Sequence, residues 1–278
     1  MKTNTQSVVV QVPKLLPDSI QSIQSLDGWC TRAKSAQMFD LVIAAAEKYK
    51  GEKLCTVELG VFGGRSLVSM AAAHKVLKNG FTIGFDTWDN VAPLEGSNSE
   101  ANTKWWRELD IIGVYKKFVN FVVTNDMHQY CRWLQIRTDV AATLFAEQSI
   151  HLMHQDSNHC YEVIVRELEL YGPRMKPGAI WVADDTNWTE AKEGYAQLPK
   201  YGFKLIEDVE TQDDQGNKVQ HSIYQKSENR KALRLIQTQF PLGRRKEETV
   251  AVETRPAIDM IQGGEVLKPE NLMFSDNI

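Results

Sequence analysis

The sequence predicts an α/β fold built on a doubly wound, mostly parallel sheet of seven strands with one antiparallel strand. Two observations support this prediction. Short apolar runs alternate with helix-forming segments through the middle of the chain, as in repeated strand–helix units. The last two apolar runs, residues 203–209 and 221–226, are instead joined by the polar turn Asp213-Asp214-Gln215-Gly216-Asn217, which is typical of an antiparallel hairpin.

Ahead of this alternation, residues 1–27 are polar and interrupted by prolines, which predicts an N-terminal arm. A helix is predicted over residues 28–49, because apolar side chains recur there at helical spacing (Met38, Leu41, Val42 and Ala45). We assign residues 1–50 to this arm and helix, and residues 51–226 to one domain that contains the sheet.

A glycine-rich run, Glu58-Leu59-Gly60-Val61-Phe62-Gly63-Gly64-Arg65-Ser66, follows the first predicted strand, residues 54–59, and opens a helix that ends near residue 77. A strand that restarts as a helix leaves backbone N–H groups unpaired at the turn, and these groups can hold a polar or charged cofactor. Glycine suits the turn because a side chain would keep the ligand away and because φ can be positive there. The run therefore predicts a cofactor site.

Two common cofactor loops do not fit this run. The dinucleotide fingerprint requires a glycine at the position of Phe62, and a phosphate-binding loop requires one more residue and a lysine in place of Arg65. The acid Glu58, two residues before the first glycine, suits instead a ligand with an ammonium group and ribose hydroxyls but no phosphate.

Four further strands are predicted before the hairpin, over residues 81–85, 118–124, 150–155 and 179–183, with helices between them over about 127–137, 161–171 and 189–200. Each of these strands ends on polar side chains: Asp86, Asn125-Asp126, Asp156 and Asp184-Asp185. The carboxyl ends of parallel strands meet at one edge of a sheet, where ligands bind. We therefore expect these side chains and Glu58 to form one site, with Asp86 at the spacing that meets ribose hydroxyls in nucleotide-type sites.

Residues 88–117 interrupt the alternation and carry three tryptophans, Trp88, Trp105 and Trp106. Because aromatic faces stack on sugar or aromatic rings, we interpret this insertion beside the predicted site as a substrate lid. The alternative is that Trp105 and Trp106 only anchor a helix, and the sequence does not decide between the two.

Three stretches resemble the class I S-adenosylmethionine-dependent methyltransferases, and the resemblance covers about residues 54–226. They are residues 57–66 (VELGVFGGRS), 154–162 (HQDSNHCYE) and 176–185 (KPGAIWVADD). Together they are similar to the metal-dependent small-molecule and sugar O-methyltransferases of antibiotic tailoring. The resemblance implies the Rossmann-like fold of these methyltransferases.

The resemblance also implies a site for the cofactor S-adenosyl-L-methionine. Glu58, Gly60 and Gly63 would shape its methionine and ribose pocket, Asp86 would hold the ribose, and the loop at Asn125-Asp126 would border the adenine. The predicted cofactor-binding residues are Glu58, Gly60, Phe62, Gly63, Ser66, Asp86, Asp126 and Asp156.

A metal site is implied as well, formed by Asp156, Asp184 and Asp185. We expect Mg²⁺ or another divalent cation, because three carboxylates are a hard, oxygen-only ligand set. Relatives often carry a second acid two residues after the first metal-binding aspartate, where it can act as general base. Asn158 stands there and cannot accept a proton in this way, so His159 is the predicted catalytic base. If His159 points away, the base lies elsewhere or the metal acts alone.

Histidines around Asp156 form a second metal pattern, His151-x-x-His154-x-Asp156-x-x-His159. Residues 151 and 154 of a strand face opposite sides of a sheet, so both cannot bind one ion without distortion. A histidine-based zinc site is therefore the less favoured hypothesis.

The composition restricts the partners. A net charge of −4 over 278 residues argues against a general nucleic-acid binder, and no run approaches the roughly 18 apolar residues of a membrane span. The four cysteines form no C-x-x-C pair, which suits reduced thiols in the cytoplasm. Residues 227–278 form a C-terminal tail, and we expect its part from residue 240 to be partly disordered or to wrap a neighbouring subunit of a homo-oligomer.

The sequence thus predicts an enzyme that moves a methyl group from S-adenosyl-L-methionine to a hydroxyl of a small molecule, assisted by a divalent cation. The acceptor would be a sugar or another polyol or phenol-like natural product. Two alternatives stay open: a methyltransferase that acts on nitrogen or without a metal, and a non-catalytic scaffold that retains the fold.

Overall fold

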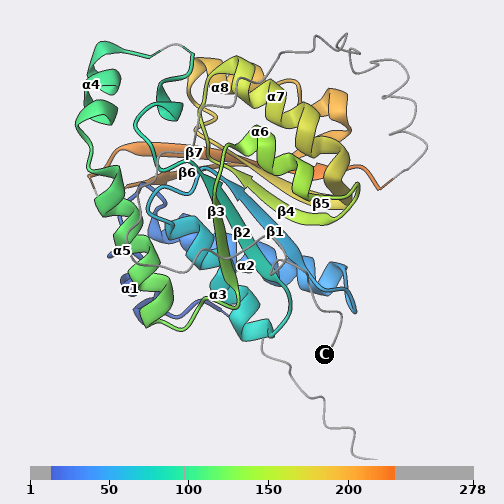
Figure 1. Ribbon diagram of the computed structural model, residues 1–278. Coiled ribbons are helices and arrows are strands. Elements are labelled where there is room, and N and C mark those ends of the chain that lie inside the picture. Colours follow the sequence, from blue (N-terminus) through green and yellow to red (C-terminus); the bar gives the residue numbers. More distant parts are fainter. Residues whose placement is uncertain (1–13, 97, 214, 229–278) are drawn as a thin grey trace, which may run out of the picture. The chain divides into compact units, whose positions relative to one another are not determined.

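The computed structural model describes residues 14–96, 98–213 and 215–228 (Figure 1). Two units divide the chain, residues 1–242 and 243–278, and every described residue belongs to the first. The C-terminal tail expected over residues 227–278 lies outside the described residues from position 229 onward, as do the first 13 residues of the N-terminal arm.

Seven strands form one sheet within the described residues, in the order β3-β2-β1-β4-β5-β7-β6. Their bounds are β1 Cys55–Leu59, β2 Phe81–Asp86, β3 Cys131–Gln135, β4 Ile150–Gln155, β5 Met175–Asp184, β6 Phe203–Gln212 and β7 Lys218–Lys226. Neighbours from β3 to β5 are parallel, whereas β7 is antiparallel to both β5 and β6. The predicted sheet, mostly parallel with one antiparallel strand, is confirmed. Its strand order reverses direction between β1 and β4, and ligands bind at such a switch point.

Helices lie on both faces of the sheet (Figure 1). Their bounds are α1 Pro17–Ile23, α2 Arg32–Lys48, α3 Arg65–Leu77, α4 Glu100–Glu108, α5 Ile111–Thr124, α6 Thr138–Ala141, α7 Tyr161–Tyr171 and α8 Thr189–Tyr195. Short 3₁₀ turns are η1 Ala92–Leu94, η2 Ala142–Leu144, η3 Gly172–Arg174 and η4 Leu198–Tyr201. α2 and α3 cover one face, and α6, α7 and α8 cover the other (Figure 1).

Alternation along the central strands builds a core on each face. In β4, Leu152 packs with the apolar side chains of α2 and α3, while its neighbour Met153 packs with those of α7 and α8. In β5, Val182 packs on the face that α2 and α3 cover, and Trp181 packs on the opposite face. Because successive strand residues point to opposite faces and both faces are covered, both strands carry apolar side chains on each face of the sheet.

The predicted third strand, residues 118–124, is wrong: this segment is the second half of helix α5. Its β-branched and aromatic composition imitates a strand, but the residues that α5 buries recur at helical spacing (Ile111, Val114, Phe118 and Val122). Asp110 caps the helix by accepting a hydrogen bond from the N–H of Gly113. The true third strand, β3, lies within the predicted helix over 127–137, and its exposed edge residues hide it from a search for apolar runs.

Element ends differ from the prediction where a cap or break decides them. The helix predicted from residue 28 begins at Arg32, because the hydroxyl of Thr31 caps it by accepting a hydrogen bond from the N–H of Lys34 at 3.1 Å. The helix predicted over 189–200 ends at Tyr195 and is followed by η4. A short helix, α1, starts at Pro17 inside the predicted arm.

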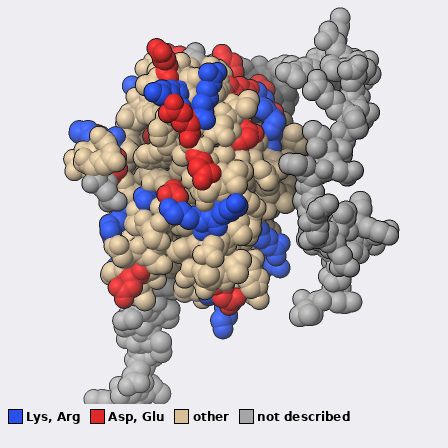
Figure 2. All heavy atoms as spheres, turned by 60° about the vertical axis from the view of Figure 1, so that its left-hand side comes forward, with Lys and Arg blue, Asp and Glu red and all other residues tan. Residues whose placement is uncertain are grey.

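None of the described helices is both long and apolar enough to cross a bilayer. On the face shown in Figure 2, basic and acidic side chains are interspersed.

The close contact between Gly60, which follows β1, and the backbone of Asp156, which follows β4, can be tested by substitution. A Cβ on Gly60 would stand 2.1 Å from the carbonyl oxygen of Asp156, whereas one on Gly216 would meet nothing within 4 Å; the φ angles are +78° and +82°. Gly216→Ala should cost about 1 kcal/mol of unfolding free energy for its backbone conformation alone, and Gly60→Ala about 2 to 4 kcal/mol. Urea unfolding of both variants measures the difference, and equal losses would contradict this packing.

Candidate functional site

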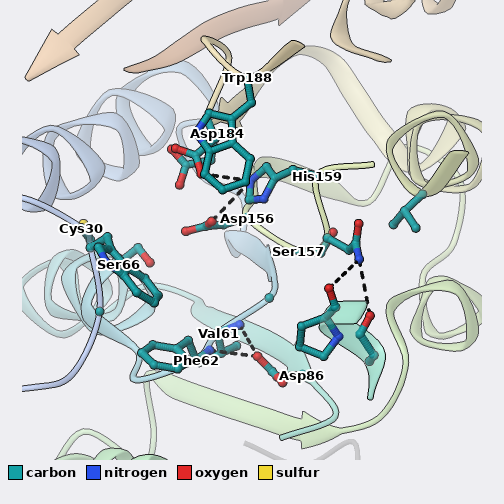
Figure 3. Close-up of a pocket in the computed structure, with 18 of the residues that line it drawn as sticks. Cys30, Val61, Phe62, Ser66, Asp86, Asp156, Ser157, His159, Asp184 and Trp188 are labelled. Atoms are coloured by element: carbon teal, nitrogen blue, oxygen red, sulfur yellow. Dashed lines mark hydrogen bonds and ion pairs between the residues drawn. The ribbon is translucent and has the colours of Figure 1, made fainter. Parts of the chain in front are cut away.

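The carboxyl ends of β1, β2, β4 and β5 open into a cavity of about 930 Å³ (Figure 3). This volume is at the upper end of the range for ligand pockets, roughly 300 to 1,000 Å³, so a cofactor and a second small molecule fit together. The lining comprises the glycine turn 60–66, Asp86, residues 156–159, Asp184-Asp185, and aromatic residues outside the sheet.

Asp86 fastens the glycine turn to β2. One carboxylate oxygen accepts hydrogen bonds from the N–H groups of Val61 and Phe62, both at 2.9 Å (Figure 3). The other accepts one from the N–H of Trp88 at 2.7 Å. Two of the N–H groups expected to face a cofactor are therefore already bonded. A carboxylate has about four acceptor positions, so Asp86 retains one for a ligand hydroxyl. Burial raises the pKa of Asp86, and its backbone hydrogen bonds oppose that rise.

Glu58 lies behind the cavity wall rather than in it. Its Oε1 accepts a hydrogen bond from the hydroxyl of Ser66 and lies 3.0 Å from Nδ1 of His154, whereas its Oε2 is buried without a hydrogen-bond partner. Burial raises the pKa of Glu58 to about 8. Ser66 lines the cavity, so Glu58 contacts the cofactor site only through its hydrogen bond with the Ser66 hydroxyl.

Asp184 is paired with a lysine that the sequence analysis missed. The Nζ of Lys34, on α2, lies 2.7 Å from Oδ1 of Asp184, and the lysine side chain is only 4% exposed. Burial opposes ionisation of Asp184, but the positive charge of Lys34 outweighs it and holds the pKa of Asp184 well below its usual range. Burial and the charge of Asp184 together raise the pKa of Asp156.

Two imidazoles face the same carboxylates. The Nε2 of His159 lies 3.8 Å from Oδ1 of Asp156 and 3.9 Å from Oδ2 of Asp185, and the Nε2 of His154 lies 3.9 Å from an oxygen of each of Asp156 and Asp184. Both Nε2 atoms are buried without a hydrogen-bond partner. Burial lowers the pKa of His159 to about 4, so its imidazole is neutral at neutral pH and can accept a proton.

These residues fit a cation. Asp156, His159 and Asp184 offer ligand atoms that all lie within 4.8 Å of one another, and Figure 3 shows the three side chains pointing toward a common point. A buried nitrogen without a partner can be satisfied by a bound ion or by the hydroxyl proton of an acceptor. The glycine turn likewise fits a nucleoside-type cofactor, since Asp86 keeps an acceptor position on the cavity wall.

The structure brings most of the predicted site residues together. Gly60, Phe62, Gly63, Ser66, Asp86, Asp156, His159, Asp184 and Asp185 all line the cavity. Among the described residues, Glu58 lies behind this lining, and Asp126 lies apart from it. Asp126 follows helix α5 at the amino end of β3, where it is exposed and 3.4 Å from His128. The wrong third strand had placed Asp126 at the opposite end of the sheet.

The carboxyl end of the true β3 contributes Ile136, Arg137 and Thr138 to the cavity, in the place predicted for Asp126. The N–H of Ile136 donates to the carbonyl of Asp86 at 2.9 Å, which holds this loop beside the glycine turn. A correct third strand would have identified these residues. The sequence indicated Lys34 less clearly. It lies four residues before Met38 and eight before Val42, so it is a charged residue on the buried apolar stripe of α2.

Asn158 has a structural role that explains why no acid stands at its position. Its amide donates hydrogen bonds to the carbonyls of Glu95 at 2.7 Å and Pro93 at 3.1 Å, and its oxygen accepts from the N–H of Cys160 at 2.8 Å. An aspartate could not donate these bonds. Asn158 therefore ties the loop after η1 to the loop after β4.

Aromatic rings form another wall of the cavity. Trp29 stacks on Phe62 with ring centroids 5.1 Å apart, and Trp105 lies 5.4 Å from Trp29 and 4.8 Å from Trp106. Trp29 and Trp105 are 54% and 40% exposed, so their faces are open to a ligand. Trp88, which the sequence analysis placed in the same lid, is instead buried and donates its indole N–H to the carbonyl of Phe62.

Three non-glycine residues at the site have left-handed backbone conformations: Phe62 (φ +50°), Trp88 (φ +44°) and Asp185 (φ +49°). Such conformations cost of the order of 1 kcal/mol or more each and are found where a fixed geometry is functional. The hydrogen bonds of Asp86 hold Phe62 and Trp88 in place.

Comparison with known proteins agrees with this geometry. Residues 57–186 match a family model described as a methyltransferase domain. The fold is similar to that of cofactor-bound Rv0187 from MTB, with a TM-score of 0.52 at 12% identity over 76% of this chain and 88% of that one. It is also similar to the O-methyltransferase NovP, with a TM-score of 0.50 at 14% identity over 70% and 79%. No curated protein sequence matches significantly. At these identities the structural likeness concerns the fold.

Asn158 can be tested by restoring an acid. In Asn158→Asp a carboxylate would face the carbonyl oxygens of Pro93 and Glu95, so the free energy of unfolding should fall by about 1 to 3 kcal/mol at pH 7. The folded-state pKa of the new carboxyl would be raised, so the loss should shrink as the pH falls and the carboxyl becomes a donor. Asn120→Asp, on the exposed side of α5, is the control. An equally stable Asn158→Asp at pH 7 would refute this role.

Proposed function

We propose that the protein is a class I S-adenosylmethionine-dependent methyltransferase and that it methylates a hydroxyl group of a small molecule beside a bound divalent cation; the match of residues 57–186 to a methyltransferase domain and the similar fold of cofactor-bound Rv0187 support this. The observation that supports this most is one cavity wall on which carboxylates and a neutral imidazole adjoin the glycine turn. A cofactor and a metal-bound acceptor can therefore share the same space.

The cofactor would occupy the part of the cavity under the glycine turn. S-adenosylmethionine, when bound, supplies an electrophilic methyl group on a sulfonium. Asp86 would accept a hydrogen bond from the ribose with its remaining acceptor position, and Ser66 would meet the polar end of the methionine moiety. Ile136 and Arg137, rather than Asp126, would border the adenine.

Asp156, Asp184 and Asp185 would hold the cation. Such an ion, when bound, lowers the pKa of an adjacent hydroxyl and orients it. His159 would accept the proton at Nε2, since that atom is buried beside Asp156 and Asp185 without another partner. Trp188 packs on the His159 ring at a centroid distance of 5.4 Å and restricts its rotation. Excluding water and fixing the donor and acceptor in line would supply much of the rate.

The acceptor would be a ring-bearing polyol or phenol. Trp29, Trp105 and Trp106 offer flat faces on the cavity wall, and such faces stack on sugar and aromatic rings. The acidic side chains in the cavity oppose a polyanionic acceptor, which supports the small-molecule class over a nucleic acid.

One observation favours a second candidate, a methyltransferase that works without a metal. Lys34 already places a positive charge against Asp184, and an ammonium can stabilise carboxylates as a cation does. However, Asp156 and Asp185 have no lysine or arginine within ion-pair distance among the described residues. The metal-dependent form therefore accounts for more of the site.

Cofactor binding and metal dependence can be measured separately. Calorimetry with S-adenosylhomocysteine should show binding that excess EDTA leaves within about threefold. Methyl transfer from labelled S-adenosylmethionine to a panel of catechols, other phenols and sugars should fall at least about 100-fold in EDTA and in Asp185→Asn. Asparagine suits the left-handed backbone of Asp185, so this variant keeps the fold. Asp126→Asn, outside the cavity, should change neither readout.

Each outcome decides between the candidates. Full turnover in EDTA would contradict the metal role and favour the Lys34-based form. Absence of S-adenosylhomocysteine binding would contradict a methyltransferase and favour a scaffold that only retains the fold.

A further inference from the structure

His154 occupies a position that the proposed chemistry does not use. It lies in β4 opposite Glu58 of β1, is fully buried, and does not line the cavity. Its Nε2 has no hydrogen-bond partner. A buried polar atom left unpaired costs about 1 to 3 kcal/mol, so this nitrogen calls for a partner that the described chain does not supply.

Glu58 fixes which nitrogen of His154 carries the hydrogen. Oε1 of Glu58 lies 3.0 Å from Nδ1 and already accepts from Ser66, so it acts as the acceptor there as well, whether the carboxyl is ionised or carries its proton on the unpartnered Oε2. With the hydrogen on Nδ1, the Nε2 atom presents a bare lone pair. That lone pair lies in the plane of the ring, on the edge directed away from Glu58.

Two carboxylate oxygens face this lone pair. Oδ2 of Asp156 and Oδ2 of Asp184 each lie 3.9 Å from Nε2 of His154, too far for a hydrogen bond. Two atoms that each bind one ion at about 2.1 Å stand roughly 3 to 4.2 Å apart, so 3.9 Å suits two ligands of a shared ion. Lys34 pairs with the other oxygen of Asp184, Oδ1, and so leaves Oδ2 available.

The Glu58–His154 pair matches the usual environment of a metal-bound histidine. Ligating imidazoles donate their second N–H to a carboxylate, which fixes the ring and strengthens the ligating nitrogen. Glu58 supplies that carboxylate, and its bond to Ser66 links the arrangement to the glycine turn. His151, on the same strand, serves as a contrast: its Nδ1 accepts from the N–H of Cys55 and its Nε2 lies 3.4 Å from Glu52.

We infer that His154 is a nitrogen ligand of the metal centre, held in its ligating form by Glu58, and that the centre prefers a transition-metal ion such as Zn²⁺ or Co²⁺ to Mg²⁺. The inference rests on the proposed function for the place of the cation, and it changes the ligand set. Imidazole suits zinc, cobalt and iron, whereas Mg²⁺ binds through oxygens. The expectation of an oxygen-only magnesium site rested on the three aspartates that the family resemblance implied, Asp156, Asp184 and Asp185, and did not include His154.

The test measures metal binding in the full-length protein. His154→Asn places an amide nitrogen where Nδ1 was, so it can still donate to Glu58 but lacks Nε2. Calorimetric titration should show Zn²⁺ and Co²⁺ affinities at least about 10-fold weaker in this variant and an Mg²⁺ affinity within about threefold of wild type. The visible absorption of bound Co²⁺ should also change. His151→Asn, the matched control on β4, should alter none of these values.

A second variant guards against a folding defect. Glu58→Gln keeps the shape of the side chain but cannot ionise when a metal binds, and Zn²⁺ affinity should fall by about 10-fold or more. The inference is overturned if His154→Asn binds Co²⁺ with unchanged affinity and spectrum, or if its Mg²⁺ and Zn²⁺ affinities fall equally. Those results would overturn the role of His154 without contradicting the proposed methyl transfer. If instead wild-type protein failed to bind S-adenosylhomocysteine but still bound metal through His154, only the proposed function would be refuted.

Discussion

The buried ion pair between Lys34 and Asp184 is the interaction on which the site depends. Three carboxylates at the ends of two adjacent strands repel one another strongly where water is scarce, and their ionised forms need compensating charge. Lys34 reaches them from α2, at the start of the chain, and neutralises one. Removing one partner of such a pair typically costs about 3 to 5 kcal/mol. Burial and the charge of Asp184 raise the pKa values of Asp156 and Asp185, so the ionised forms of these two side chains need the further compensation that a bound cation would supply.

Strand order explains why the proposed cation site and the proposed cofactor site adjoin. β1 and β4 are neighbours, with Glu58 opposite His154 and Leu59 opposite Gln155. The backbone of Asp156 fills the space beside Gly60 that any Cβ would need, and its N–H donates to the carbonyl of Leu59. The turn that would hold the cofactor and the loop that carries Asp156, a proposed metal ligand, are thus in direct contact.

Local pattern predicted most of the fold and much of the site, because strands such as residues 150–155 are buried on both faces and end on polar side chains. Prediction failed where tertiary context decides. Residues 118–124 have strand-like composition but one buried helical stripe, and β3 is an edge strand with exposed side chains. Lys34 is far from the acids in sequence. Strand alternation showed that His151 and His154 face opposite sides, but only the neighbouring strands determine that His154 faces the acids.

The most direct test of the whole account is a crystal of the protein grown with S-adenosylhomocysteine and Zn²⁺, measured on both sides of the zinc absorption edge. The account predicts one anomalous peak within bonding distance of His154 Nε2 and oxygens of Asp156 and Asp184, beside cofactor density at the glycine turn. An anomalous peak remote from these residues, or Lys34 Nζ occupying that position instead of a metal, would contradict it.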